Sequence, residues 1–120
     1  MGVERMRYTL PKTALLRKSA QYKAVYQQGK RIRGRHFSLI VLDNDHGYNR
    51  LGISVHGVKT AVRRNRFKRI VREFFRLNRD FLPPSKDIVF AIRKECTFDS
   101  PQAVYDAVIT SIQQHEKRKK

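Results

Sequence analysis

Basic residues recur every four positions in the middle of the chain, at Arg64, Lys68, Arg72 and Arg76. On an α-helix this spacing places the four side chains on one face, because residues i and i+4 are neighbours there. Guanidinium groups bind phosphate oxygens in a bidentate manner, and Asn65 beside them can both donate and accept hydrogen bonds. The chemistry that these residues predict is the binding of a phosphate backbone.

The same segment also carries an apolar stripe. At about 100° per residue, the stripe and the cations fall on opposite sides of a helix, and Arg69 joins the cations. Only Glu73 relieves the repulsion between like charges, whereas a solvated helix usually mixes both signs. We therefore predict a helix from Lys59 or Thr60 to Asn78 that packs by one side and binds by the other. The predicted packing residues are Phe67, Ile70, Val71, Phe74 and Leu77.

The charge of the whole chain favours the same interpretation. The 120 residues include 27 Lys and Arg against 10 Asp and Glu, a formal net charge of +17. A compact domain this cationic repels itself, so we expect a large polyanion as its partner, with nucleic acid first and no membrane. A single cysteine, Cys96, excludes a disulfide framework and, with no apolar signal-like stretch at the N-terminus, indicates a cytoplasmic protein.

The remaining segments predict one α+β domain. A first helix capped by Ser19 should run to about Gln28, and Ser100 with Pro101 should open a last helix. Three segments are typical of strands, and the first two should form a hairpin. The third has an almost unbroken apolar run, which suggests burial on both faces. These strands are HFSLIVLDN (36–44), RLGISVH (50–56) and DIVFAIR (87–93).

With these elements in place, the segment AVRRNRFKRIVREFFR resembles the basic helix of the protein subunit of bacterial ribonuclease P. The similarity extends over residues 15–112 and includes RGRHFSLIVL, RLGISV and DIVFAIR. One departure is HGVKT, residues 56–60, which is one residue shorter than the family's loop and lacks its lysine pair and its Gly-Asn turn. The matching positions are Tyr22, Val25, Tyr26, Gly29, Ala61, Val62, Arg64, Asn65, Arg66, Lys68 and Arg69.

The resemblance implies a fold. It implies an α-β-β-β-α-β-α sandwich with a small mixed sheet, in which KRIRG (30–34) is a further strand and a left-handed β-α-β crossover holds the basic helix. We expect a flexible basic arm over residues 1–14, a single RNA-binding domain over residues 15–115 and a basic tail over residues 116–120.

The resemblance also implies a role beside a catalytic RNA that removes the 5′ leader of precursor tRNA with Mg²⁺ held by the RNA. It implies a cleft for the leader at Tyr22, Tyr26, Phe37 and Ile40. Phe37 and Ile40 have opposite parity in one strand, so only one can face that cleft, and we favour Ile40. The residues expected to bind RNA are Arg63, Arg64, Asn65, Arg66, Lys68, Arg69, Arg72 and Arg76.

No catalytic or metal-binding residues are predicted in the protein itself. The acidic residues are scattered, the close pair Asp43 and Asp45 suits a turn, and the four histidines lack the spacing of a metal site. The alternatives are another structured-RNA-binding protein such as a ribosomal protein, a stand-alone nuclease, and a DNA-binding module. Tyr22 and Tyr26 could also be core residues, and no obligate protein partner is inferred.

Overall fold

The computed structural model describes residues 10–119. Apart from a short 3-10 turn near the start, the elements follow the predicted order α-β-β-β-α-β-α. In chain order they are η1 (Lys12–Ala14), α2 (Ser19–Gln28), β1 (Lys30–Gly34), β2 (Phe37–Asp43), β3 (Arg50–His56), α3 (Ala61–Leu77), β4 (Lys86–Arg93) and α4 (Pro101–Lys119).

The four strands form one mixed sheet in the order β1-β2-β4-β3. β1 pairs with β2 and β2 with β4 in antiparallel fashion, whereas β3 and β4 are parallel. The predicted hairpin between β2 and β3 is therefore wrong, because β4 lies between them. This central place buries five of the eight residues of β4, on both of its faces, which suits its apolar sequence.

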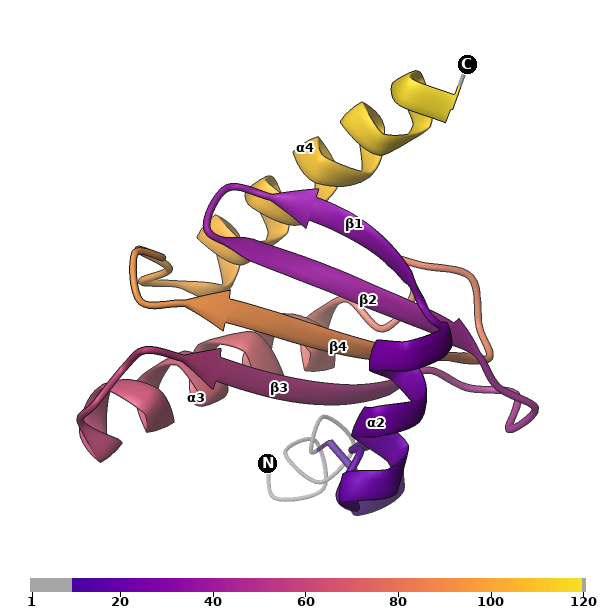
Figure 1. Cartoon of the computed structure of the whole chain (residues 1–120), viewed down its shortest axis with the longest axis horizontal. Coiled ribbons are helices and arrows are strands. Elements are labelled where there is room, and N and C mark those ends of the chain that lie inside the picture. Colours follow the sequence, from indigo (N-terminus) through magenta and orange to yellow (C-terminus); the bar gives the residue numbers. More distant parts are fainter. Residues whose placement is uncertain (1–9, 120) are drawn as a thin grey trace, which may run out of the picture.

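The helices cover the two faces of the sheet unequally. α2 lies in front of the sheet in Figure 1, while α3 and α4 lie behind it. Strands β3 and β4 both point left in that view, with β4 above β3 and α3 behind, so the β3-α3-β4 crossover is left-handed. This hand is rare, and it agrees with the implied fold.

Two groups of buried residues hold the layers together. Behind the sheet, Phe37, Leu39 and Phe90 pack with α3 and α4 in the main core. In front of it, a smaller cluster joins Ile40 and Val89 of the sheet to α2. The expectation that Phe37 and Ile40 point to opposite faces of β2 is confirmed, since the two residues lie in different clusters.

The segment before α2 is packed against the edge strand β3. The amide of Leu16 donates to the carbonyl of Leu51 (2.8 Å), and Ala14 is fully buried. The packed part of the chain therefore includes residues ahead of the expected boundary at residue 15. The expected cap at Ser19 is displaced by one residue, because Lys18 is the N-cap and Ser19 is the first helical residue.

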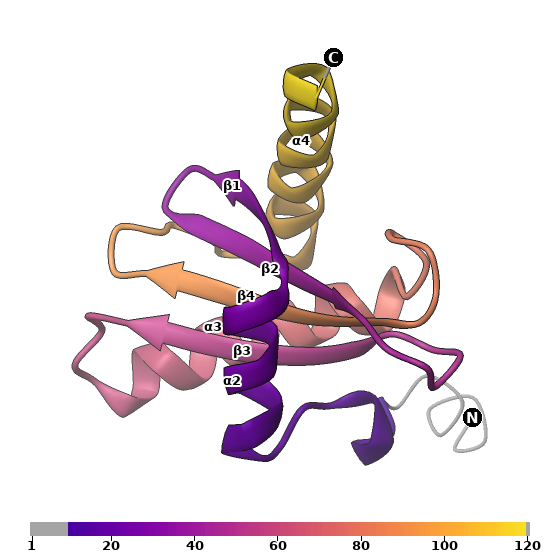
Figure 2. The same ribbon diagram turned by 45° about the vertical axis from the view of Figure 1, so that its right-hand side comes forward.

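The C-terminal helix begins as predicted. The hydroxyl oxygen of Ser100 accepts a hydrogen bond from the amide of Ala103 (3.1 Å), and Pro101 is the first helical residue. The far end of α4 projects beyond strand β1, as Figure 2 shows. Within residues 10–119 no helix combines the length and the apolar character that crossing a bilayer requires.

Candidate nucleic-acid interface

Helix α3 packs on the sheet through one side only. Phe67, Val71, Phe74 and Phe75 are buried against the main core. Ile70 is only partly buried, and Leu77 is 57% exposed, so its predicted packing role is wrong. The buried side of the helix is rotated from the predicted stripe towards Phe75.

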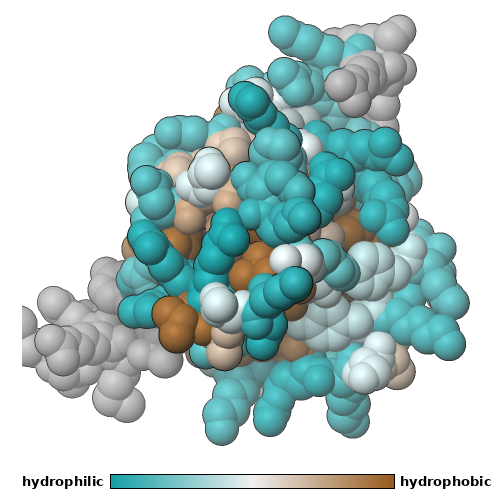
Figure 3. All heavy atoms as spheres, turned by 60° about the vertical axis from the view of Figure 1, so that its left-hand side comes forward, coloured by the Kyte–Doolittle hydropathy of each residue, from teal (hydrophilic) through white to brown (hydrophobic). Residues whose placement is uncertain are grey.

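The opposite side of α3 presents a basic face made of Asn65, Arg66, Lys68, Arg69 and Arg72. All five side chains are exposed except that of Lys68, which is partly buried. Within residues 10–119 none of their side chains forms a hydrogen bond or an ion pair. In Figure 3, which brings the left-hand side of Figure 1 forward, hydrophilic side chains dominate the surface, with small hydrophobic patches between them.

Three of the predicted RNA-binding arginines are engaged within the protein. Nη1 of Arg64 donates to the carbonyls of Val58 (2.8 Å) and Lys59 (3.2 Å). Nη2 of Arg63 donates to the carbonyl of Lys94 (2.9 Å).

Arg76 is the third engaged arginine, and it pairs with Glu73 in the preceding turn of α3. The hydrogen bond from Arg76 lowers the pKa of the Glu73 carboxyl, so this pair stays ionised. These three arginines therefore have structural contacts that the members of the basic face lack.

The shortened loop HGVKT has a defined structure. Gly57 adopts a positive φ of 78°, Val58 is buried, and Thr60 caps α3 by accepting a hydrogen bond from the amide of Arg63 (3.4 Å). Arg64 donates hydrogen bonds to two carbonyls of the same loop. The loop thus fixes the start of the basic helix by contacts that the sequence pattern alone did not indicate.

A hollow of about 300 Å³ connects α2 to the basic face of α3 across the edge of strand β3. The hydroxyl oxygen of Tyr22 accepts a hydrogen bond from the amide of Ile53 (3.1 Å) at this edge. The predicted residues Tyr22, Lys68 and Arg72 therefore come together in one place. The residues that form most of the wall are Arg17, Tyr22, Leu51, Ile53, Lys68 and Arg72.

Tyr26 lies one turn further along α2 and faces strand β1. The guanidinium carbon of Arg31 lies 5.7 Å from the centre of its ring. The Tyr26 hydroxyl is buried and forms no hydrogen bond with any residue that the structure describes. Tyr22 and Tyr26 are both partly buried, so each packs on the protein and keeps some exposed surface.

The other two predicted leader residues do not offer a surface to a ligand. Phe37 is 1% exposed, and its ring stacks on Phe90 and makes a tilted contact with Phe98 in the main core, on the face opposite α2. Ile40 lies on the α2 side, as favoured, but it is completely buried beneath that helix. Direct contact of Phe37 or Ile40 with a leader is therefore excluded in this arrangement.

Sequence reasoning missed the residues that form the open part of the sheet beside α2. Ser38, Ala91 and Ser54 lie next to one another across β2, β4 and β3, and all three are partly exposed. Arg33 of β1 continues the row. Because side chains alternate along a strand, Ser38 must lie on the same face as Ile40, and this signal could have identified Ser38. The rest of the row could not be identified in this way, because it depends on the order of the strands in the sheet.

The described residues offer no gathered set of catalytic or metal-binding groups. Within residues 10–119 no cluster of three or more His, Cys, Asp or Glu side chains is arranged to hold a metal ion. Asp43 pairs with Lys86, which lowers the pKa of its carboxyl. Burial raises the pKa of the Cys96 thiol, which disfavours the reactive thiolate.

Comparison with known proteins agrees with this geometry. Residues 10–116 match the family model of ribonuclease P. The ribonuclease P protein component of Desulfotalea psychrophila is 52% identical over 103 residues, which cover 85% of this chain and 86% of that protein. The protein component of Syntrophus aciditrophicus is 48% identical over 68% of this chain and 69% of that protein.

Solved structures give the same result. The RNase P protein of Thermotoga maritima superposes with a TM-score of 0.70 and 32% identity, covering 79% of this chain and 91% of the other. For the Staphylococcus aureus protein the TM-score is 0.74 at 25% identity, with 87% and 96% of the chains covered. The fold, the basic helix and these relatives together show that the chain belongs to the ribonuclease P protein family, the protein components of a ribonucleoprotein endoribonuclease.

Proposed function

We propose that this chain binds the catalytic RNA of ribonuclease P through the basic face of α3 and the 5′ leader of precursor tRNA beside α2. In this role it assists the Mg²⁺-dependent endonucleolytic removal of the leader. The observation that carries the proposal is the basic face itself, whose cations have no carboxylate partner within residues 10–119.

The proposed contact with the catalytic RNA is electrostatic. Each phosphate that a Lys or Arg side chain neutralises releases counterions, which favours binding without reading the base sequence. The guanidinium groups of Arg66, Arg69 and Arg72 can also each bind two oxygens of a phosphate in a bidentate manner. The aromatic residues on the buried side of α3 hold the helix that carries these groups against the sheet.

The proposed path of the leader follows the hollow at Tyr22 and the open sheet row that includes Ser38. Tyr22 offers part of an aromatic ring, while Lys68 and Arg72 offer cations within the same hollow. A single-stranded nucleic acid binds best where cations accompany aromatic surfaces. Small side chains in the row leave room for a nucleotide above the sheet.

Magnesium is assigned to the RNA of the assembled enzyme. Among the described carboxylates, Asp43, Glu73 and Asp87 each pair with a cation. Such groups do not fit the converging oxygen set that Mg²⁺ requires. When bound to the RNA, the ion supplies the activation of water, and the protein supplies binding.

The sequence also allowed other nucleic-acid-binding functions. Membership of the family favours this function over that of a ribosomal protein or a DNA-binding module. We also propose a cytoplasmic protein whose partners are the catalytic RNA and precursor tRNA, with no obligate protein partner.

Reconstitution tests the proposal. The protein is added to a cognate bacterial catalytic RNA at an Mg²⁺ concentration too low for efficient cleavage by the RNA alone. Release of the 5′ leader from labelled precursor tRNA should be restored. Cleavage by the protein without RNA would overturn the assignment of catalysis, and no effect on the RNA would overturn the proposed role.

A further inference from the structure

A second hollow, of about 630 Å³, lies beside the one at Tyr22. Lys12, Leu15 and Arg17 line both, so the two hollows adjoin along the segment that precedes α2. The second hollow lies on the side of Tyr48 and Arg50 rather than on the side of α3. Its main lining residues are Lys12, Arg17, Lys18, Gln21, Tyr48 and Arg50.

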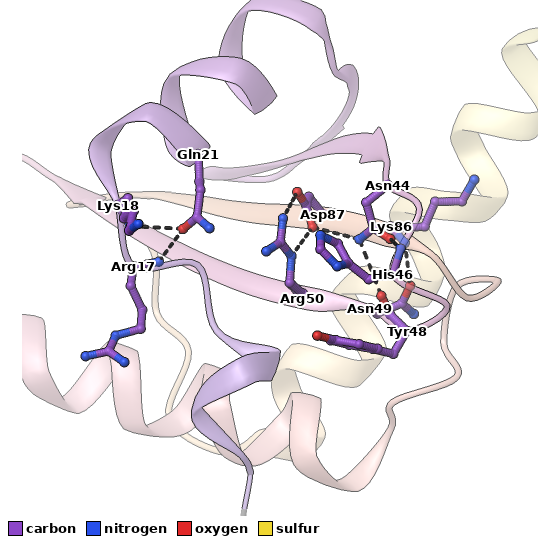
Figure 4. Close-up of polar contacts among 10 residues, drawn as sticks. All are labelled: Arg17, Lys18, Gln21, Asn44, His46, Tyr48, Asn49, Arg50, Lys86 and Asp87. Carbon is purple, nitrogen blue, oxygen red and sulfur yellow. Dashed lines mark hydrogen bonds and ion pairs between the residues drawn. The ribbon is translucent and has the colours of Figure 1, made fainter.

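One wall is fixed by a buried ion pair at the start of β3. Nε and Nη2 of Arg50 donate to the two carboxylate oxygens of Asp87, each at 2.7 Å, and Asn44 donates to the same carboxylate at 2.8 Å (Figure 4). Asp87 is 6% exposed. The pair holds Arg50 rigidly and compensates its charge.

Tyr48 stands two residues before Arg50 and is 36% exposed. The ring of His46 packs against it with the centroids 5.8 Å apart. An aromatic side chain that is supported in this way and still exposed is suited to stacking with a planar ligand. Gln21 and Arg50 line the same hollow as Tyr48.

The other wall is the start of α2. Oε1 of Gln21 accepts hydrogen bonds from the amides of Arg17 (2.8 Å) and Lys18 (2.9 Å), which fixes the backbone of both residues. The side chains of Lys12, Arg17 and Lys18 are exposed and have no carboxylate partner within residues 10–119. No acidic side chain lines this hollow among the described residues.

We propose that this second hollow binds a leader nucleotide beyond those held at Tyr22, with Tyr48 stacking on the base and Lys12, Arg17 and Lys18 binding phosphate. The inference rests on the proposed function, which it extends by a second subsite. Stacking on an aromatic ring accepts any base, so the subsite recognises leader length rather than leader sequence.

Continuity favours the leader over the catalytic RNA as the occupant. A strand lying at Tyr22 reaches the second hollow by passing over Lys12 and Arg17, which belong to both. The basic face of α3 contributes to the first hollow but not to the second. An RNA bound on α3 would reach Tyr48 only through the hollow at Tyr22, which the proposed function gives to the leader.

The test measures the affinity of the reconstituted holoenzyme for fluorescent precursor tRNAs whose leaders lengthen by one nucleotide at a time. For the parent protein, affinity should rise in a second step once the leader is long enough to reach Tyr48. Tyr48→Ala should remove this step, about 5-fold or more, in line with the loss at other base-stacking aromatics. Tyr48→Phe should keep the step.

Tyr105→Ala is the matched control, because Tyr105 on α4 is 37% exposed and lies outside both hollows. Thermal melting of each variant checks that the fold is kept. A step that survives Tyr48→Ala, a parent that shows no second step, or a loss that is equal for every leader length would overturn the inference. If, in addition, leader-bearing and mature tRNA bind equally well to the parent, the proposed function fails too.

Discussion

The basic face of α3 makes a quantitative prediction about salt dependence. We consider the triple variant Lys68→Ala, Arg69→Ala and Arg72→Ala. These side chains have no carboxylate partner within residues 10–119, so their loss breaks no ion pair. Arg64 is left intact because it also holds the carbonyls of Val58 and Lys59.

The magnitude follows from counting phosphate contacts. If each of the three residues neutralises one phosphate, the slope of log K against log salt becomes less negative by about 2.1 to 2.7. Stability should be kept or should rise by a few tenths of a kcal/mol, because the variant removes repulsion between residues four positions apart. The assay is filter binding of the catalytic RNA across a salt series, with denaturation of the free protein alongside.

A control variant that loses the same charge separates the effect of phosphate contacts from the effect of net charge. Lys23→Ala, Arg35→Ala and Lys117→Ala remove three exposed cations from α2, the β1–β2 turn and α4. This second triple lowers the net charge by the same amount from +17 but should change the slope much less. An unchanged slope in the α3 triple, or an equal change in both triples, would refute the reasoning.

Three further predictions concern other parts of the structure. Asp87→Ala leaves the largely buried guanidinium of Arg50 unpaired and should cost about 3–5 kcal/mol in chemical denaturation. A Cβ at Gly52 would lie 2.8 Å from the Tyr22 ring, so Gly52→Ala should cost about 1–3 kcal/mol and should also weaken leader binding. The lowered pKa of Glu73 means that its stabilisation is present above the ordinary pKa and is lost as the pH falls through the lowered one. Glu73→Gln should therefore be slightly less stable than the parent at neutral pH, and the difference should vanish in acid denaturation series.

Local patterns were enough to predict the basic helix and its two sides. The i, i+4 spacing of the cations and the aromatic residues between them depend only on helix geometry, and both are found in α3. The parity of Phe37 and Ile40 likewise follows from the pleat of a single strand. These features need no knowledge of distant segments.

Long-range packing determined what the patterns could not predict. The apolar run of β4 indicated burial on both faces, yet the preference of consecutive strands to pair favoured a β2–β3 hairpin. Insertion of β4 between them depends on contacts between residues far apart in the chain. The hydrogen bonds of Arg63 and Arg64 to backbone carbonyls could not be predicted either. A guanidinium that binds carbonyls needs no acidic partner, so the sequence shows no pair of opposite charges.

The place of β4 in the sheet has a consequence for the order of events during synthesis. β2 and β3 have no direct contact as a strand pair, and each completes its ladder only when residues 86–93 have left the ribosome. Until then α3 lacks the finished surface on which its phenylalanines rest. The nascent chain therefore completes the support for its arginine array only when β4 has emerged, which is later than the synthesis of α3 itself.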